Sequence, residues 1–138
     1  MDPIFILKDE HAQIRNVLSE LDETINSGEK SLYAISKFNM LNNFWKKHEE
    51  KEERFLELFE ENGKKFPVRK TLIREHRELR GHWKVLEESM SSLNEEKLKI
   101  ALKIDGCMLI EKLRNHIKRE DEFFEEIKGE GIKFDEWD

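Results

Sequence analysis

The stretch NHIKREDEFF, residues 115–124, carries the spacing on which the fold prediction rests. Glu120 follows His116 by four residues, and Phe123 comes three residues later. A near twin, KHEEKEERF at residues 47–55, repeats this spacing at three positions: His48, Glu52 and Phe55. Steps of three and four residues place side chains on one face of an α-helix. Both stretches are therefore predicted to be helical, with a histidine and a glutamate on the same face as an aromatic ring.

Breaker residues divide the chain into long segments. They cluster in NSGEKS at residues 26–31, NGKKFP at 62–67 and SSLNEE at 91–96. Gly63 suits the end of a helix, Pro67 the first position of the next helix, and Asn94 an N-terminal cap with acids in the first turn. No segment alternates polar and apolar residues as a strand does. We predict an all-α fold, an up-down-up-down antiparallel four-helix bundle, forming a single domain over residues 1–138.

Each segment contains an apolar stripe of the kind that an amphipathic helix turns inward. The first stripe consists of Leu7, His11, Ile14, Leu18, Leu21 and Ile25. The second consists of Phe38, Leu41, Trp45, His48, Glu52, Phe55 and Phe59. The third consists of Leu72, His76, Leu79, Trp83, Leu86, Met90 and Leu93. The fourth consists of Leu109, Leu113, His116, Glu120, Phe123 and Ile127.

Composition excludes several classes of function. The 138 residues include 25 basic and 31 acidic side chains, a net charge of -6, mixed without the basic patch that binds phosphates. Nucleic acid is therefore not an expected partner. No apolar run approaches the length of a membrane span, and the first residues lack the pattern of a signal peptide. The single cysteine, Cys107, forms no internal disulfide, and we expect a cytoplasmic protein with no membrane partner.

The unusual feature is that every stripe contains a histidine and two also contain a glutamate. If an inward stripe takes roughly three positions in seven, chance places four histidines on four stripes only about 3% of the time. Counting residues from the turns puts His11, His48 and Glu52 at one level, since a helix rises about 1.5 Å per residue. His76 and His116 differ by roughly one turn. We therefore expect the fourth helix to start late or to carry an irregularity near residues 105–106.

A buried set of imidazoles and carboxylates needs cations, which metal ions supply. Residues four apart share a helix face, so each histidine-glutamate pair offers a nitrogen and an oxygen to one site. The mixed N/O set is larger than one tetrahedral zinc uses, and it suits iron or manganese. We infer a two-metal site, with iron as the first choice, whose ligands are His11, His48, Glu52, His76, His116 and Glu120.

These residues resemble the hemerythrin-like family, in particular its HHE cation-binding branch. Four stretches carry the resemblance, which spans about Leu7 to Ile127: DEHAQIR, HEEKEERFLELFE, REHRELR and HIKREDEFFEEI. The resemblance implies that the six residues hold a non-haem di-iron centre with Glu52 and Glu120 as bridges. It also implies binding of dioxygen, nitric oxide or peroxide, or a role in oxygen sensing or iron handling.

Two departures bear on function. Oxygen carriers of the family have a further histidine four residues after the one on the third helix, where this chain has Arg80. That loss leaves coordination positions for water, an oxidant or a third carboxylate such as Glu49, and it favours a sensor or redox site over a simple oxygen carrier. Carriers also often end in a histidine with an aspartate five residues later, as Asp121 would be, but Glu120 lies closer to His116 around the helix.

The remaining polar and aromatic residues are expected to lie on the surface or to pack in the core. His82 is expected on the surface, Trp45, Trp83 and Cys107 in packing, and Asp105 out of reach of the metals. Glu10 and Glu75 each precede a ligand histidine; we expect solvated surface roles, with hydrogen bonding to a ligand as the alternative. The tail GEGIKFDEWD, residues 129–138, is expected to fold over the end of the bundle, or else to dock a partner.

The sequence thus leaves three functions open. The first is a di-iron protein that binds dioxygen or a related diatomic molecule for storage, sensing or delivery. The second is an enzyme that uses the same site to reduce peroxide or nitric oxide, or to oxidise ferrous iron. The third is a metal-free helical interaction module whose polar core sets the helix register. The oligomeric state is not predicted.

Overall fold

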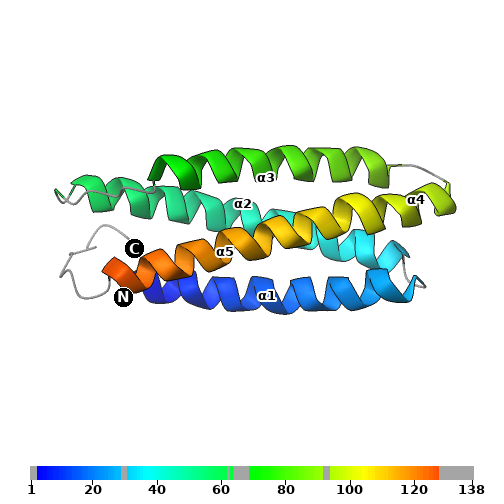
Figure 1. Ribbon diagram of the computed structural model, residues 1–138, viewed down its shortest axis with the longest axis horizontal. Coiled ribbons are helices and arrows are strands. Elements are labelled where there is room, and N and C mark those ends of the chain that lie inside the picture. The colour runs from blue at the N-terminus through cyan, green and yellow to red at the C-terminus, as the bar shows by residue number, and fades with distance from the viewer. Residues whose placement is uncertain (1–2, 29–30, 62, 64–68, 92–93, 128–138) are drawn as a thin grey trace.

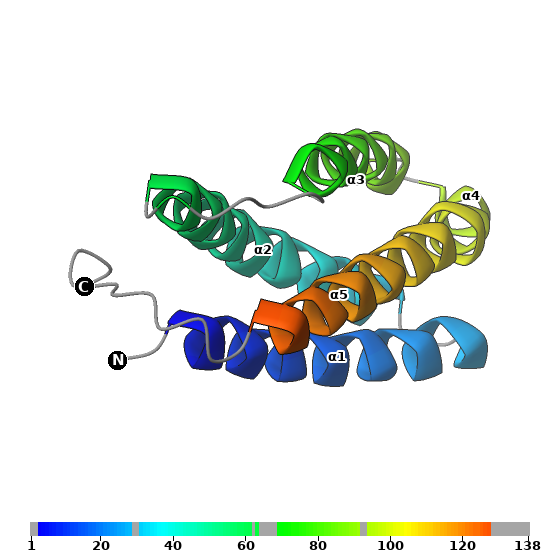
Figure 2. The same cartoon turned by 60° about the vertical axis from the view of Figure 1, so that its left-hand side comes forward.

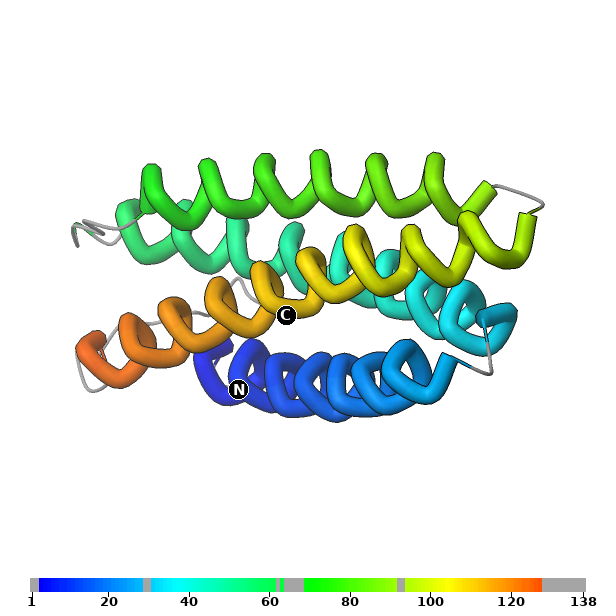
Figure 3. The backbone as a smooth tube through the Cα atoms, turned by 45° about the vertical axis from the view of Figure 1, so that its right-hand side comes forward, coloured from blue at the N-terminus to red at the C-terminus, as the bar shows by residue number. Residues whose placement is uncertain are grey.

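The structure is a computed structural model that describes residues 3–28, 31–61, 63, 69–91 and 94–127. Four helical rods run alternately in opposite directions (Figure 1). The first three are α1 (Pro3–Ser27), α2 (Ser31–Glu61) and α3 (Arg69–Met90). The fourth is continuous through α4 (Glu95–Ala101), the π-helical segment η1 (Leu102–Gly106) and α5 (Cys107–Ile127), as Figure 3 shows. The prediction of an all-α bundle is confirmed, and the described residues contain no strand.

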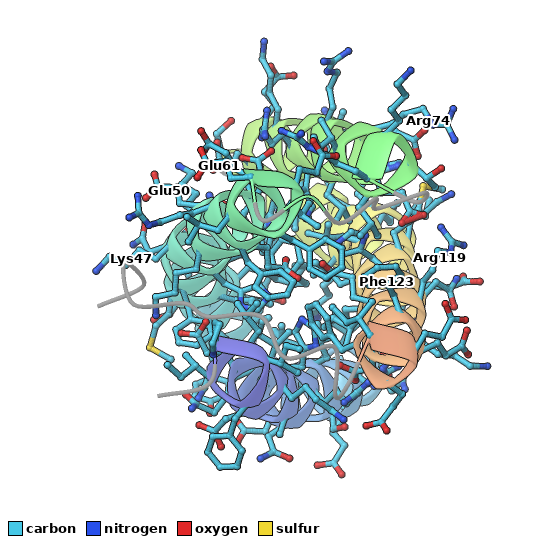
Figure 4. All side chains as sticks on the ribbon, turned by 90° about the vertical axis from the view of Figure 1, so that its left-hand side faces the viewer. Lys47, Glu50, Glu61, Arg74, Arg119 and Phe123 are labelled. Carbon is cyan, nitrogen blue, oxygen red and sulfur yellow. The ribbon has the colours of Figure 1, made fainter. Side chains whose placement is uncertain are left out.

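The helices occupy the corners of a four-cornered bundle. α1 packs against α2 and α5, and α3 packs against the same two helices, so α1 and α3 lie diagonally across the core (Figure 2). Viewed along the bundle, Lys47, Glu50, Arg74 and Arg119 project outward from the helices (Figure 4). None of the helices in the described part of the chain is long and apolar enough to cross a membrane.

The predicted ends of the helices are largely where the sequence put them. Gly28 and Gly63 take positive φ angles of 69° and 77°, which a glycine adopts at little cost, and each donates its N–H to a carbonyl of the preceding helix. The Asn94 side chain accepts hydrogen bonds from the backbone N–H groups of Glu96 and Lys97, which confirms it as the cap. The position predicted for Pro67 lies outside the described residues.

The four stripes form the core, since every stripe residue within the described ranges is buried. Leu93 of the third stripe lies outside those ranges, as does the tail at 129–138. Two apolar clusters result. A large one, containing Phe38 and Leu86, fills the bundle on one side of the histidines, and a smaller one, containing Phe55 and Phe124, fills the other side. The polar layer therefore lies between two apolar plugs that exclude water.

The irregularity expected in the fourth helix is the π-helical segment η1. The helix starts at Glu95 as the cap predicts, so it does not start late. At the end of η1 the N–H of Cys107 donates to the carbonyls of Ile104 and Leu102. The bond to Leu102, five residues back, is the bond of a π-turn, which holds more residues than an α-turn. A Cβ on Gly106 would lie 3.2 Å from the Phe38 ring, so the small residue lets the bulged helix approach α2.

Candidate metal centre

The six predicted ligands meet at one level of the core. Their side chains come from all four rods and are 0–2% exposed. The Nε2 atom of His48 lies 3.0 Å from a Glu52 oxygen, and that of His116 lies 2.9 Å from a Glu120 oxygen. The structure therefore brings together the two histidine-glutamate pairs that the sequence spacing predicts.

The six residues form two overlapping sets of potential ligand atoms. One set consists of His11, His48, Glu52 and Glu120, and the other of Glu52, His76, His116 and Glu120. In each set the ligand atoms lie within 4.8 Å of one another. Because both glutamates belong to both sets, the arrangement matches two neighbouring cations that share two carboxylates.

The buried atoms in this layer lack ordinary partners. The Nε2 atoms of all four histidines, both Glu52 side-chain oxygens and one Glu120 oxygen make no hydrogen bond. Buried polar atoms are almost always satisfied, because leaving one unpaired costs about 1–3 kcal/mol. Such a group of unpaired nitrogens and oxygens facing one another is typical of residues that bind metal ions. The residues thus fit a metal centre on the chemistry of their own atoms.

Outer carboxylates fix the orientation of three of the histidines. The Nδ1 atom of His11 lies 2.6 Å from Asp121, that of His48 lies 2.9 Å from Glu10, and that of His116 lies 2.9 Å from Glu75. A carboxylate only accepts hydrogen bonds, so the proton belongs on Nδ1 and the Nε2 lone pair faces the cluster. This is the support that metal-binding histidines usually have.

Each outer carboxylate is itself held by a cation from the same helix as the histidine. Arg15 donates to Asp121 at 2.5 Å, Lys51 donates to Glu10 at 2.6 Å, and Arg119 pairs with Glu75. The fourth histidine follows the pattern more loosely. His76 Nδ1 lies 3.6 Å from Glu53, too far for a hydrogen bond, and Arg80 lies 3.5 Å from the same carboxylate. Three of the histidines are thus held firmly and one is not.

Without metal, protons would balance the buried carboxylates. Burial lowers the pKa of His11, but a hydrogen bond to Asp121 and the neighbouring carboxylates of Glu120 and Glu52 outweigh it and raise the pKa to about 11. The pKa of His48 is raised to about 9, because the charge of Glu52 and a hydrogen bond to Glu10 outweigh burial. Burial raises the pKa of Glu52 less than the neighbouring charge of His48 lowers it, so that pKa falls well below its usual value. Metal ions would take the place of these protons.

Several smaller predictions can be compared with the structure. The surface role expected for Glu10 and Glu75 is wrong: each makes a buried or half-buried hydrogen bond to a ligand histidine on a neighbouring helix rather than on its own. Asp121 faces His11 and not the cluster, as the preference for Glu120 implied. His82 belongs to none of the potential metal sets found among the described residues.

The remaining residues of interest surround the cluster. The Trp45 ring lies 5.2 Å from His48 and 5.7 Å from His116, which makes it a wall of the site. Trp83 packs against Phe38, Asp105 accepts from Ser89, and Cys107 packs against the large apolar cluster. Glu49 belongs to neither of the two sets that contain Glu52 and Glu120. It accepts hydrogen bonds from Trp45 Nε1 at 3.0 Å and from Arg80 Nε at 2.6 Å.

Sequence reasoning gave hydrogen bonding to a ligand only as the alternative for Glu10 and Glu75 and did not pair Asp121 with His11, although a signal for these contacts exists. A basic residue follows each cluster histidine by three or four positions: Arg15, Lys51, Arg80 and Arg119. On a helix these residues lie beside the histidine. A carboxylate from the next helix then bridges the histidine and the cation, a contact that only packing reveals.

Comparison with known families gives one result. The model of the hemerythrin HHE cation-binding domain matches residues 2–127, nearly the whole chain. Searches of curated proteins and of solved structures found no significant match.

Proposed function

The chain belongs to the hemerythrin HHE cation-binding family, and from that premise we propose that its core holds two non-haem iron ions and binds dioxygen or a related diatomic molecule there. One observation carries the proposal: the orphaned Nε2 atoms and carboxylate oxygens fall into two sets that share Glu52 and Glu120. A set of nitrogen and oxygen ligands in this proportion suits iron, and it also suits manganese. We retain manganese as the alternative metal.

The role of the protein residues follows from their positions. His11 and His48 would hold one ion and His76 and His116 the other, while Glu52 and Glu120 would bind both. When bound, the iron would supply electrons and the open coordination positions that a diatomic molecule needs. The apolar clusters on either side keep bulk water away from the layer. Electrostatic interactions within the layer are therefore stronger than they would be in water.

A second candidate function is a redox enzyme that reduces peroxide or nitric oxide, or oxidises ferrous iron, at the same centre. It is favoured by the surroundings of Arg80, which stands where oxygen carriers of the family have a further histidine. Arg80 binds Glu49 at the wall of the site, so one ion would have fewer protein ligands and more room for a reacting molecule.

Metal analysis of protein purified without chelators tests the proposal. About two iron ions per chain are expected, and an iron-free, fully stable bundle would favour the metal-free interaction module instead. Replacing His48 with alanine should lower the iron content, because His48 faces the cluster. Replacing His82 with alanine should leave it unchanged and serves as the matched control.

Reaction with oxygen separates the two candidate functions. Stopped-flow mixing of the reduced protein with dioxygen should give a lasting oxygenated spectrum if the protein is a binder. A spectrum that decays rapidly while reductant is consumed over repeated cycles would identify an enzyme. Replacing dioxygen with nitric oxide or peroxide in the same experiment identifies the preferred small molecule.

A further inference from the structure

A groove between α2 and α3 leads from solvent toward the metal cluster. It encloses about 480 Å³ and is lined by Asn42, Trp45, Glu49, Glu53, Arg80 and Glu87, among others. The two helices lie side by side in Figures 1 and 3. Trp45 belongs both to this groove and to the wall of the cluster, since its ring is 6.1 Å from His76. The cluster itself is closed to solvent, so an incoming ion needs a path of this kind.

Behind two groove-lining residues, Glu49 and Glu53, lies an unsatisfied nitrogen. The Nδ1 atom of His76 is buried and makes no hydrogen bond, and His76 is 0% exposed. A Glu53 oxygen lies 3.6 Å from this Nδ1 atom. Oxygens of Glu49 and Glu53 and a nitrogen of His76 all lie within 4.8 Å of one another. The other three histidines use Nδ1 in a hydrogen bond to a carboxylate, so His76 is the exception.

A positive charge already occupies this position. The Arg80 guanidinium donates to Glu49 and lies 3.5 Å from Glu53, which shows that the two carboxylates attract a cation. The Arg80 side chain is 55% exposed and can swing into solvent without leaving the surface of the protein. A divalent cation that enters the groove would therefore compete with an exposed side chain and not with a buried one.

We propose that Glu49, Glu53 and Nδ1 of His76 form an outer cation site, at which a divalent metal ion binds after displacing Arg80 and before it enters the inner cluster. The proposal rests on the proposed two-metal centre. A neutral imidazole has one lone pair, so His76 binds a metal ion either outward through Nδ1 or inward through Nε2. The outer site is therefore a loading position and empties when the inner site fills.

The test is the rate at which the full-length, metal-free chain takes up Co²⁺, followed by visible absorption after stopped-flow mixing. Glu53→Gln should slow uptake by tenfold or more and leave the final content at about two ions per chain, because Glu53 is not an inner ligand. Arg80→Ala should accelerate uptake, because it removes the competing cation. Glu57→Gln, an exposed glutamate one turn further along α2, is the matched control and should load at the wild-type rate.

The outcomes separate this inference from the proposed function. If the wild-type chain takes up two ions but Glu53→Gln loads as fast as wild type, the outer site is wrong and the inner centre stands. Slower uptake by Arg80→Ala would also overturn the outer site. If the wild-type chain takes up no cobalt, the two-metal centre fails, and the loading site fails with it. An unchanged final ion count in Glu53→Gln shows that this variant folds.

Discussion

The half of the metal layer on α1 and α2 and the half on α3 and α5 contain the same kinds of residue, but they hold their histidines with different firmness. In the first half, both histidines hydrogen-bond through Nδ1 to an outer carboxylate, at 2.6 Å for His11 and 2.9 Å for His48. In the second half His116 does so at 2.9 Å, but His76 lies 3.6 Å from Glu53. The loosely held histidine is the one beside the groove. On the proposed function, the first half would hold its ion with two firmly oriented histidines, and the second would hold its ion with one firmly oriented histidine and one that lies behind the groove-lining residues Glu49 and Glu53.

Removing a ligand that both halves share should remove the metal from both of them. Glu52→Gln takes a carboxylate from both sets, so both halves should lose their metal and the content should fall from about two ions per chain to near zero. Elemental analysis after gel filtration measures this. Retention of one ion would mean that the two halves bind independently and that Glu52 does not bridge them.

Removing one outer carboxylate from each half should affect the two halves differently. Glu10→Gln weakens the support of His48 and should lower metal affinity by about 10–100-fold. Glu53→Gln should change the final affinity much less, because His76 makes no hydrogen bond to Glu53, and should act on the loading rate. Competition with a chelator of known affinity gives both values. Equal losses of affinity in the two variants would contradict the difference in rigidity.

The pH dependence of stability should have opposite signs in the metal-free and metal-loaded forms. In the metal-free form the pKa values of His11 and His48 are raised to about 11 and about 9, against about 6.5 in an unfolded chain. The stability from these charged histidines is fully present below about pH 6.5 and is lost as pH rises toward the folded values. The metal-free bundle should therefore weaken between pH 7 and pH 9.

In the metal-loaded form the ligand nitrogens carry no proton to lose. The unfolded chain binds more protons below about pH 6.5, so stability should rise up to that pH and then level off. Urea unfolding of both forms at a series of pH values measures the two slopes. Parallel curves would mean that the histidines are not the groups that exchange protons for metal.

The fold and the inner cluster were predictable because they depend on periodicity. The spacing of His48 and Glu52 alone puts both on one helix face, and the buried stripes follow the same steps of three and four. Counting residues indicated a late start or an irregularity near residues 105–106, and the π-helical segment η1 covers these positions.

The outer partners were not predictable, because they cross between helices. Glu10 precedes His11 but binds His48, and Glu75 precedes His76 but binds His116. Such contacts depend on the rotation of each helix about its own axis, which a single sequence does not specify. The difference between the two halves of the layer therefore emerged only from the packed bundle.

The most direct test of the central claim is anomalous X-ray diffraction at the iron edge, on crystals of protein purified without chelators. We predict two iron peaks per chain, one beside His11 and His48 and one beside His76 and His116, each within bonding distance of both Glu52 and Glu120. A single peak, or two peaks that do not share the two glutamates, would contradict it.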